Sequence, residues 1–265
     1  ARVDQSKCVG CKNCERHCPT DAIKVTPGVM PGYVPPCGTA CPAGTDVQGY
    51  IALAGAGRYE DAYRLIRQSN PFPSVCGRIC NHPCQAACNR NDLDESVGIR
   101  DIKRFVADKA FENGMPVVEK KRKSNGKKIA VIGAGPSGLS CAYYLQLSGY
   151  SVEVFESESV AGGVLAYGIP EYRLPKAVLN RDIQAIEATG VQIHLNTTVG
   201  EDVSFDELYK KFHAVYVSTG TQLSRKANIP GEDMPGVYHG LDFLKAVNLG
   251  KPVEIGKKVA VIGGG

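Results

Sequence analysis

The spacing of apolar residues changes near residue 128. Before this point, apolar side chains recur every three or four residues in segments 47–54, 59–68 and 99–110, which predicts three amphipathic helices. After it, residues 129–132 are apolar without a polar break. Such a run is typical of a strand in a parallel sheet that is covered on both faces. We therefore expect a helical part followed by a part with a buried sheet.

Helices and strands alternate after this first strand. The apolar pattern predicts helices that begin near residues 139, 178 and 205, and further strands at 151–155, 191–195 and 214–218. This order is typical of an α/β domain with a parallel sheet. The predicted fold class is an α/β Rossmann-like domain, preceded by a small all-α domain.

A glycine-rich turn, Gly133-Ala134-Gly135-Pro136-Ser137-Gly138, joins the first strand to the following helix. In a dinucleotide-binding fold Gly133 permits the tight turn, Gly135 lets backbone amides approach a pyrophosphate, and Gly138 lets the helix pack against the strand. Glu156 follows the second strand, 23 residues after Gly133, near the spacing at which an acid hydrogen-bonds a ribose hydroxyl. A glycine turn in some other α/β domain is the alternative, and it explains this combination less well.

The opening of the sheet part is repeated near the end of the chain. Gly256 to Gly265 matches Gly126 to Gly135 at a constant offset of 130 residues, which predicts the first strand of a second dinucleotide-binding domain. The chain stops inside this second glycine turn. We therefore expect the segment to be part of a longer protein.

Composition and charge exclude some classes of partner. The chain has 265 residues, 43% hydrophobic and 22% charged, which is enough for more than one globular domain. Much of its net charge of +4 lies in a basic run, Lys120 to Lys128, which lacks the interleaved aromatic residues of a nucleic-acid patch and is predicted to be a solvated linker. No apolar run approaches the roughly 20 residues of a membrane span. We expect neither a nucleic acid partner nor a membrane span.

Ten of the eleven cysteines lie before residue 89. A secreted disulfide framework would be small and would lack a dinucleotide fold, so the spacings favour metal. Cys8, Cys11, Cys14 and Cys18, the last followed by a proline, have the spacing of a bacterial ferredoxin [4Fe–4S] run, with a zinc or structural-thiol site as the alternative. Because the fourth cysteine of such a run usually reaches a second cluster, either a further run lies upstream or Cys18 serves a cluster built with later cysteines.

Six more cysteines lie in the helical part. Cys37 and Cys41 are in a stretch rich in proline and glycine, and Cys76, Cys80, Cys84 and Cys88 recur every four residues. Pro83 excludes one continuous helix with a stripe of thiols, so we expect a looped cage around metal. In this cage His82 is more readily a loop residue than a ligand. Cys141, in the α/β part, is interpreted as a small packing residue.

Several motifs of residues 37–265 occur together in one known family. They are Cys37-x-x-x-Cys41-Pro42, Asn70-Pro71-Phe72, Cys76-Gly77-Arg78-Ile79-Cys80, the turn Gly133 to Gly138, Gly162-Gly163-x-Leu165-x-Tyr167-Gly168-Ile169-Pro170 with Arg173-Leu174-Pro175-Lys176, and Ser218-Thr219-Gly220. The chain thus resembles the small subunit of glutamate synthase, the N-terminal half of dihydropyrimidine dehydrogenase and the large subunit of NADH-dependent ferredoxin:NADP oxidoreductase.

The resemblance implies the cofactors and the residues that contact them. FAD would be bound by the first Rossmann motif and NAD(P)H by the second, as cofactors of an NAD(P)H oxidoreductase. The predicted FAD contacts are Gly133, Gly135, Pro136, Ser137, Gly138, Glu156, Gly162, Gly163, Leu165, Tyr167, Arg173, Thr219 and Gly220. Cysteines of the helical domain would hold two [4Fe–4S] clusters, and no side chain need act as a catalytic acid or base.

The chain departs from the family pattern at one cluster. The family usually carries a further pair of cysteines, and Val29 and Gly32 stand in their places. Cys41, Cys80 and Cys84 are predicted to share one cluster. Cys37 and Cys88 are assigned to another, whose remaining ligands are either Cys76 or cysteines of the N-terminal run.

The predicted division is 1–30 ferredoxin-like segment, 31–115 helical iron–sulfur domain, 116–127 linker, 128–250 FAD-binding domain and 251–265 start of the NAD(P)-binding domain. Electrons would pass between NAD(P)H, FAD and the clusters to other redox subunits of a complex, with ferredoxin as a further candidate partner and electron bifurcation as a variant. The alternatives are a glutamate synthase small subunit and a scaffold subunit with a vestigial nucleotide site. Oxygen-sensitive clusters suggest the cytoplasm of an anaerobe.

Overall fold

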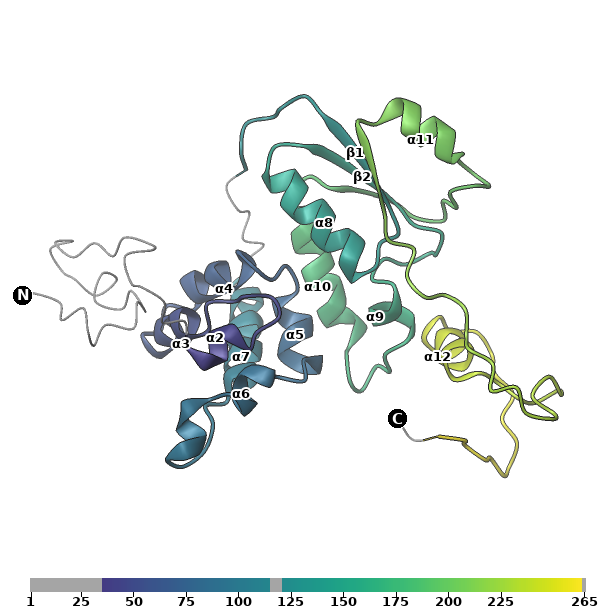
Figure 1. Cartoon of the computed structure of the whole chain (residues 1–265), viewed down its shortest axis with the longest axis horizontal. Helices are drawn as coiled ribbons and strands as arrows, with labels where there is room; N and C mark the ends of the chain where they lie inside the picture. The colour runs from purple at the N-terminus through teal and green to yellow at the C-terminus, as the bar shows by residue number, and fades with distance from the viewer. Residues whose placement is uncertain (1–34, 115–120, 264–265) are drawn as a thin grey trace, which may run out of the picture. The chain divides into compact units, whose positions relative to one another are not determined.

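The computed structural model describes residues 35–114 and 121–263, in two compact units (Figure 1). The helical unit contains the described residues up to 114 together with Asn180–Ala188. The sheet unit contains Lys121–Leu179 and the described residues from Thr189 onward. The predicted ferredoxin-like segment, with Cys8, Cys11, Cys14 and Cys18, lies outside the described residues.

The helical unit is made of short helices. They are α2 (Pro36–Thr39), α3 (Val47–Gly55), α4 (Tyr59–Arg67), α5 (Pro73–Ile79), α6 (Pro83–Ala86), the 3-10 helix η1 (Asn89–Asp92) and α7 (Ile99–Glu112). Asp46 caps α3, because its side chain accepts a hydrogen bond from the N–H of Gly49. The three predicted amphipathic helices are therefore confirmed as α3, α4 and α7. The four cysteines after residue 75 do not share one helix, as Pro83 predicts: Cys76 lies on α5, Cys80 at its end, Cys84 on α6 and Cys88 before η1.

The core of the helical unit lies between α3, α4 and α7. Tyr50, Tyr63, Ile66 and Val106 are fully buried there. The hydroxyl of Tyr50 donates a hydrogen bond to the carbonyl of Ile99 at 3.0 Å, so the polar end of this buried ring is paired. The aromatic rings thereby fix the position of α7 against α3.

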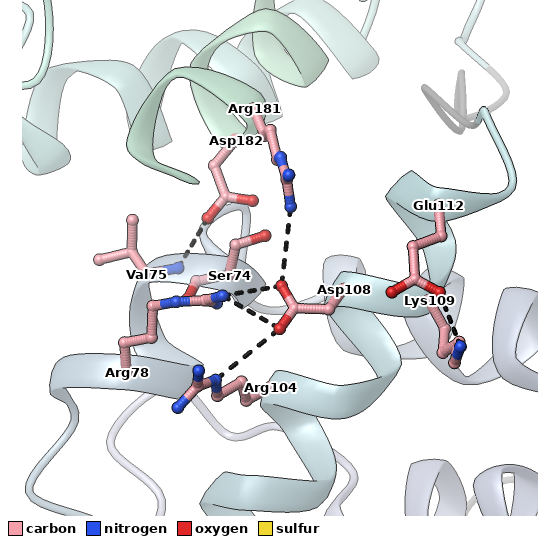
Figure 2. A network of polar contacts seen from close by, with 9 residues as sticks. All are labelled: Ser74, Val75, Arg78, Arg104, Asp108, Lys109, Glu112, Arg181 and Asp182. Carbon is pink, nitrogen blue, oxygen red and sulfur yellow. Dashed lines mark hydrogen bonds and ion pairs between the residues drawn. The ribbon is translucent and has the colours of Figure 1, made fainter. Parts of the chain in front are cut away.

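Helix α10 (Lys176–Glu187) contributes its C-terminal part to the helical unit (Figure 2). Asp182 is fully buried and accepts a hydrogen bond from the N–H of Val75 at 3.0 Å. Arg67, also fully buried, donates to the carbonyl of Ala185 at 3.2 Å. These bonds link α10 to α4 and α5 through polar groups that are removed from water, where an unmade bond is costly.

A second set of contacts around Asp108 joins the same helices. Arg78 donates to both carboxylate oxygens of Asp108, at 2.9 and 3.0 Å. Arg104 and Arg181 approach this carboxylate at 3.7 Å each. Figure 2 shows Asp108 between these three guanidinium groups, with Asp182 beside Val75. One carboxylate on α7 therefore ties α5 and α10 to its own helix.

The sheet unit contains four parallel strands in the order β3-β2-β1-β4. They are β1 (Lys128–Ile132), β2 (Ser151–Phe155), β3 (Gln192–His194) and β4 (Ala214–Val217), connected and followed by α8 (Pro136–Leu147), α9 (Val164–Tyr167), α10, α11 (Phe205–Lys211) and α12 (Gly240–Asn248). Two of the four residues 129–132, Ala130 and Val131, are fully buried, and the other two are less than a tenth exposed. The predicted α/β class with a parallel sheet is confirmed.

One predicted strand is wrong. The segment Val259 to Ile262, which repeats the sequence of β1, forms no strand and is exposed, with Val261 at 83% and Ile262 at 85%. A strand of a parallel sheet needs a neighbouring strand to pair its backbone groups. The sheet of the described residues offers it no partner, since β3 and β4 form the edges and neither pairs with this segment.

In the described part of the chain, no helix combines the length and the hydrophobicity needed to cross a bilayer.

Candidate functional site

Two positions of the turn after β1 require glycine, because backbone carbonyl oxygens approach them closely. Gly133 has φ of 101°, and a Cβ there would lie 2.4 Å from the carbonyl oxygen of Ser218. A Cβ on Gly138 would lie 2.0 Å from the carbonyl oxygen of Gly133. Ser218, at the end of β4, donates its hydroxyl to the carbonyls of Ile132 and Gly133 at 3.0 and 3.2 Å. The turn is therefore held between α8 and the end of β4.

A cavity of about 320 Å³ opens at the carboxyl ends of the strands. Among its lining residues are nine of the predicted FAD contacts: Gly133, Gly135, Pro136, Ser137, Glu156, Gly163, Tyr167, Thr219 and Gly220. Ligands of open parallel sheets bind at this edge. The structure therefore brings most of the predicted contacts together.

Four predicted FAD contacts do not line this cavity: Gly138, Gly162, Leu165 and Arg173. Gly138 packs α8 against β1. Gly162 is bonded to the turn, since its N–H donates to the carbonyl of Ala134 at 2.8 Å. Leu165 is half-buried, and Arg173 is exposed. Gly138 and Gly162 thus shape the turn that surrounds the cavity.

The sequence prediction missed several lining residues. Thr197, Thr198 and Val199 follow β3, Phe155 and Ser157 flank Glu156, and Thr221 and Gln222 follow the turn after β4. The available signal was topological, because the residues that follow each parallel strand meet at one edge of the sheet. No residue type in Thr197 to Val199 points to a nucleotide by itself.

The carboxylate of Glu156 is held at the edge of the cavity. Glu156 is 5% exposed, and its Oε2 accepts a hydrogen bond from the N–H of Ala134 at 2.7 Å. Its Oε1 accepts from the N–H of Glu158 at 2.9 Å. The acid is thereby fixed beside the glycine turn, with its side chain in the wall of the cavity.

The chemistry of these groups fits a dinucleotide. A Cβ built on Gly135 meets nothing within 4 Å, so the first turn of α8 has open space where a pyrophosphate would lie. The N-terminus of α8 supplies free backbone amides and a partial positive charge there. Glu156 supplies an acceptor for ribose hydroxyls.

Tyr167 also lines the cavity and is held by three side chains. Its hydroxyl donates to Oε1 of Gln222 at 3.0 Å, and its carbonyl accepts from Nδ2 of Asn248 at 2.7 Å. Nζ of Lys245 lies 5.2 Å from the centre of its ring and also pairs with the carboxylate of Glu158. Burial raises the pKa of the Tyr167 hydroxyl, which keeps it a neutral donor. Helix α12 thus contacts Tyr167 in the wall of the cavity and Glu158, two residues after Glu156.

The thiols of the helical unit are free and arranged around Tyr50 and α7. Cys41, Cys76, Cys80, Cys84 and Cys88 carry no disulfide, and neither does Cys37. Burial raises the pKa values of the Cys76 and Cys84 thiols. Burial also raises the pKa of Cys41, but hydrogen bonds from Thr45 and Ala43 outweigh it and leave this pKa below its ordinary value. Such N–H donors around a sulfur favour the thiolate that an iron–sulfur cluster requires.

The predicted cage is not closed. Among the described residues, no group of three or more His, Cys, Asp or Glu side chains is placed to hold a metal ion. Cys80 accepts from the N–H of His82 at 3.3 Å, and Cys76 donates to Oδ1 of Asn70 at 3.7 Å. His82 precedes α6 with φ of 45°, so its backbone conformation serves the turn between α5 and α6. The donor set, free thiols with nearby N–H groups, still fits an iron–sulfur cluster chemically.

Cys37 and Cys88 come together at a different place. Both line an apolar cavity of about 400 Å³, with Val47, Ile51 and Ile99 among its other walls. Cys76 does not line this cavity. Both cysteines thus line one cavity, while their assignment to one cluster and its further ligands stay predictions.

Three family models match the chain. Residues 127–265 match the pyridine nucleotide-disulphide oxidoreductase family, residues 30–115 match the 4Fe-4S cluster domain II of dihydropyrimidine dehydrogenase, and residues 1–24 match a 4Fe-4S binding domain. The matches confirm the predicted order of iron–sulfur and Rossmann-like parts. They also confirm FAD, [4Fe–4S] clusters and NAD(P)H as the cofactors.

Curated relatives are similar over most of the chain. The NADPH-Fe(3+) oxidoreductase subunit beta of Geobacter sulfurreducens is 42% identical over 88% of this chain and 35% of that protein. The NADP(+)-dependent formate dehydrogenase subunit beta of Moorella thermoacetica is 43% identical over 89% of this chain and 37% of that protein. The glutamate synthase [NADPH] small chain of Escherichia coli is 38% identical over 87% of this chain and 52% of that protein. The chain thus spans about half or less of the length of these relatives.

Among solved structures, Mycobacterium tuberculosis FprA in complex with NADPH is 26% identical, with a TM-score of 0.42 over 48% of this chain and 29% of that chain. The family assignment rests on the sequence matches together with the cavity described above. The chain belongs to the pyridine nucleotide-disulphide oxidoreductase family, within the group of glutamate synthase small-subunit-like proteins that join this fold to a 4Fe-4S domain.

Proposed function

We propose that the full-length protein transfers electrons between NAD(P)H, FAD and [4Fe–4S] clusters and passes them to a partner redox subunit. The observation that carries this proposal is the presence in one chain of a cavity at a glycine turn and of a thiol-rich helical unit. A flavin exchanges electrons with nicotinamide in pairs and with iron–sulfur clusters singly, so the two sites are chemically complementary.

The residues of the sheet unit have separate roles in this proposal. The amides at the start of α8, opened by Gly133 and Gly135, bind the pyrophosphate. Glu156, fixed by the N–H of Ala134, orients the ribose. Tyr167 borders the flavin ring, and its contacts with Gln222, Lys245 and Asn248 hold that wall in place. No side chain serves as an acid or base on a further substrate.

The thiols of the helical unit hold the clusters. We assign Cys41, Cys80 and Cys84 to one cluster, and Cys37 and Cys88 to another that is completed by Cys76 or by N-terminal cysteines. Cys8, Cys11 and Cys14 hold a cluster of the ferredoxin type, with Cys18 as the ligand that reaches a neighbouring one. The grouping is supported by the shared cavity of Cys37 and Cys88 and by the spacing of the N-terminal cysteines.

The partner and the setting follow from the same chemistry. The relatives named above are a beta subunit in two cases and a small chain in the third, which supports assembly with a second redox subunit. A ferredoxin is a further partner of matching chemistry, since it too exchanges single electrons. Oxygen-sensitive clusters support the cytoplasm of an anaerobe as its setting. We retain the division of the chain at 31–115 and 128–250 as part of this proposal.

The test is anaerobic purification of the full-length protein, followed by iron and flavin analysis and by titration with NADPH and with NADH. We expect one FAD and at least eight irons per chain, and bleaching of the flavin absorbance by one of the two nucleotides. Protein with no flavin, or with fewer than four irons, would contradict the proposal. A flavin that neither nucleotide reduces would instead indicate the scaffold alternative.

A second candidate, a glutamate synthase small subunit, is favoured by one observation, the similarity to the small chains of Escherichia coli and Bacillus subtilis. Co-purification with a glutaminase-bearing large subunit, and glutamate formation from glutamine and 2-oxoglutarate, would support it. A disulfide reductase is disfavoured, because no pair of cysteines accompanies Gly162 and Gly163 in the sequence.

A further inference from the structure

Lys103 of α7 is a buried lysine whose charge has no counter-ion among the described residues. The residue is 7% exposed. The other basic residues of α7 are Arg100, Arg104 and Lys109, and each has a carboxylate oxygen within 4 Å. For Lys103 the described part of the chain offers neither an ion pair nor a hydrogen bond, and its one directional contact is the ring of Tyr50, 5.8 Å from Nζ. A buried charge without a partner costs several kcal/mol, on the order of a domain's net stability.

The surroundings of Lys103 are built from thiols. Cys84 is buried in the same core as Tyr50 and Ile99, the first residue of α7. On α5, Gly77 lies between Cys76 and Cys80. This glycine approaches α7 so closely that a Cβ there would be 2.7 Å from Cα of Arg104. Burial is the largest influence on the pKa values of the Cys41, Cys76 and Cys84 thiols and raises them, while the positive charge of Lys103 acts on all three in the opposite direction.

The backbone around Cys80 and Cys84 is tied to α7 by two hydrogen bonds of Arg100. Arg100 donates to the carbonyl of Cys80 at 3.2 Å, and its N–H donates to Oε1 of Gln85 at 3.0 Å. These bonds place the turns around Cys80 and Cys84 against the first turn of α7. Lys103 stands one turn further along this helix. The segments that carry Cys76, Cys80 and Cys84 therefore contact the part of α7 that contains Lys103, and a negatively charged group held by these thiols would balance its charge.

We propose that the Lys103 ammonium is the counter-charge of an anionic iron–sulfur cluster held by the thiolates of Cys41 and Cys84, and that it raises the reduction potential of this cluster. The inference rests on the function proposed above. One-electron reduction adds one negative charge to the cluster, and a fixed positive charge beside it stabilises the reduced form more than the oxidised form.

The test is a redox titration of the full-length protein, followed by electron paramagnetic resonance, for wild type and Lys103→Met. Methionine matches the length of lysine and suits an apolar core, so this variant is expected to fold. We expect the equilibrium constant for reduction of one cluster to fall at least tenfold. For a one-electron couple this is a shift of about 59 mV to more negative potential.

Three variants serve as controls. Lys109→Met removes the same charge from an exposed position of the same helix and should leave all potentials unchanged. Lys103→Arg retains the charge and should stay near the wild-type potential. Cys84→Ser identifies the signal that belongs to the helical unit, because that signal should be the one it loses.

The outcomes separate this inference from the proposed function. Wild-type potentials for every cluster of Lys103→Met would overturn the role of Lys103, while the clusters themselves would remain established. Loss of iron from Lys103→Met with retention in Lys103→Arg would support a charge requirement for cluster assembly. Loss of iron from both variants would show that the shape of the side chain matters rather than its charge, and would overturn the inference. Wild-type protein without a cluster signal sensitive to Cys84→Ser would contradict the proposed function itself.

Discussion

The two units of this protein build their sites in opposite ways. In the sheet unit, backbone geometry defines the cavity, through a turn in which two glycines are required by contacts of 2.0 and 2.4 Å. In the helical unit, side chains define the site, through free thiols that form no complete metal group among the described residues. A dinucleotide site of this kind exists before its ligand binds. A cluster site is completed by the cluster, whose bonds to sulfur contribute to folding.

The largest expected effect tests this dependence in the helical unit. Cys84→Ser should remove about four irons per chain and lower the stability of the helical unit, because Cys84 is both a proposed ligand and part of the core. Iron analysis and thermal unfolding of the full-length protein measure both effects. Cys141→Ser, at a half-buried position of α8, is the matched control and should retain all iron. Full iron content in Cys84→Ser would remove this residue from the ligand set.

The next effect concerns the backbone-defined site. Gly138→Ala should lower the unfolding temperature of the sheet unit and abolish FAD binding, because the new Cβ would overlap the carbonyl of Gly133. Gly135→Ala meets no protein atom within 4 Å, so it should weaken FAD binding without loss of stability. Flavin content and calorimetry distinguish the two results. Equal stability losses in both variants would show that the turn is not the rigid element described here.

A smaller effect tests whether α10 belongs to the helical unit. Burial raises the pKa of Asp182 to about 7, above its ordinary value in the unfolded chain. The folded protein therefore binds a proton that the unfolded chain has already released between about pH 4 and pH 7. Across this window the free energy of unfolding falls as pH rises, by at most about 1.4 kcal/mol per pH unit, and it levels off above pH 7.

Asp182→Asn should lack this part of the pH dependence. Between pH 4.5 and pH 8 its free energy of unfolding should therefore fall less than that of the wild type. Urea unfolding at several pH values measures the difference, in which other titrating groups cancel. Asp101→Asn, on the exposed side of α7, is the control and should keep the wild-type slope. An unchanged slope in Asp182→Asn would mean that Asp182 is not removed from water.

The smallest effect concerns the support of the cavity walls by α12. Lys245→Met removes the cation over the Tyr167 ring and the ion pair with Glu158, and should weaken FAD binding by about 1 kcal/mol, or about fivefold. Fluorescence titration of the apoprotein with FAD measures it. Lys226→Met breaks an exposed ion pair with Asp233, in the segment between β4 and α12, and should leave the affinity unchanged. Equal affinities for both variants would limit α12 to a packing role.

The sequence by itself determined the elements with strong local signals. The apolar run of β1, the glycine turn and the cap at Asp46 depend on residues close together in the chain, so periodicity and turn chemistry were sufficient. The spacing of the cysteines indicated metal for the same reason. The sequence also predicted that Gly133, Gly135 and Glu156 lie close together, because residues that follow parallel strands meet at one edge of the sheet.

Only the tertiary structure decided the contacts between distant segments. It placed Thr197 to Val199 in one cavity and Cys37 and Cys88 in another, and it grouped Asn180–Ala188 with the helical unit through Asp182 and Arg67. It also left Val259 to Ile262 outside any strand, although their sequence repeats β1. The physical reason is that a strand or a buried charge is stable only with its partner, and a local pattern does not specify which distant partner is present.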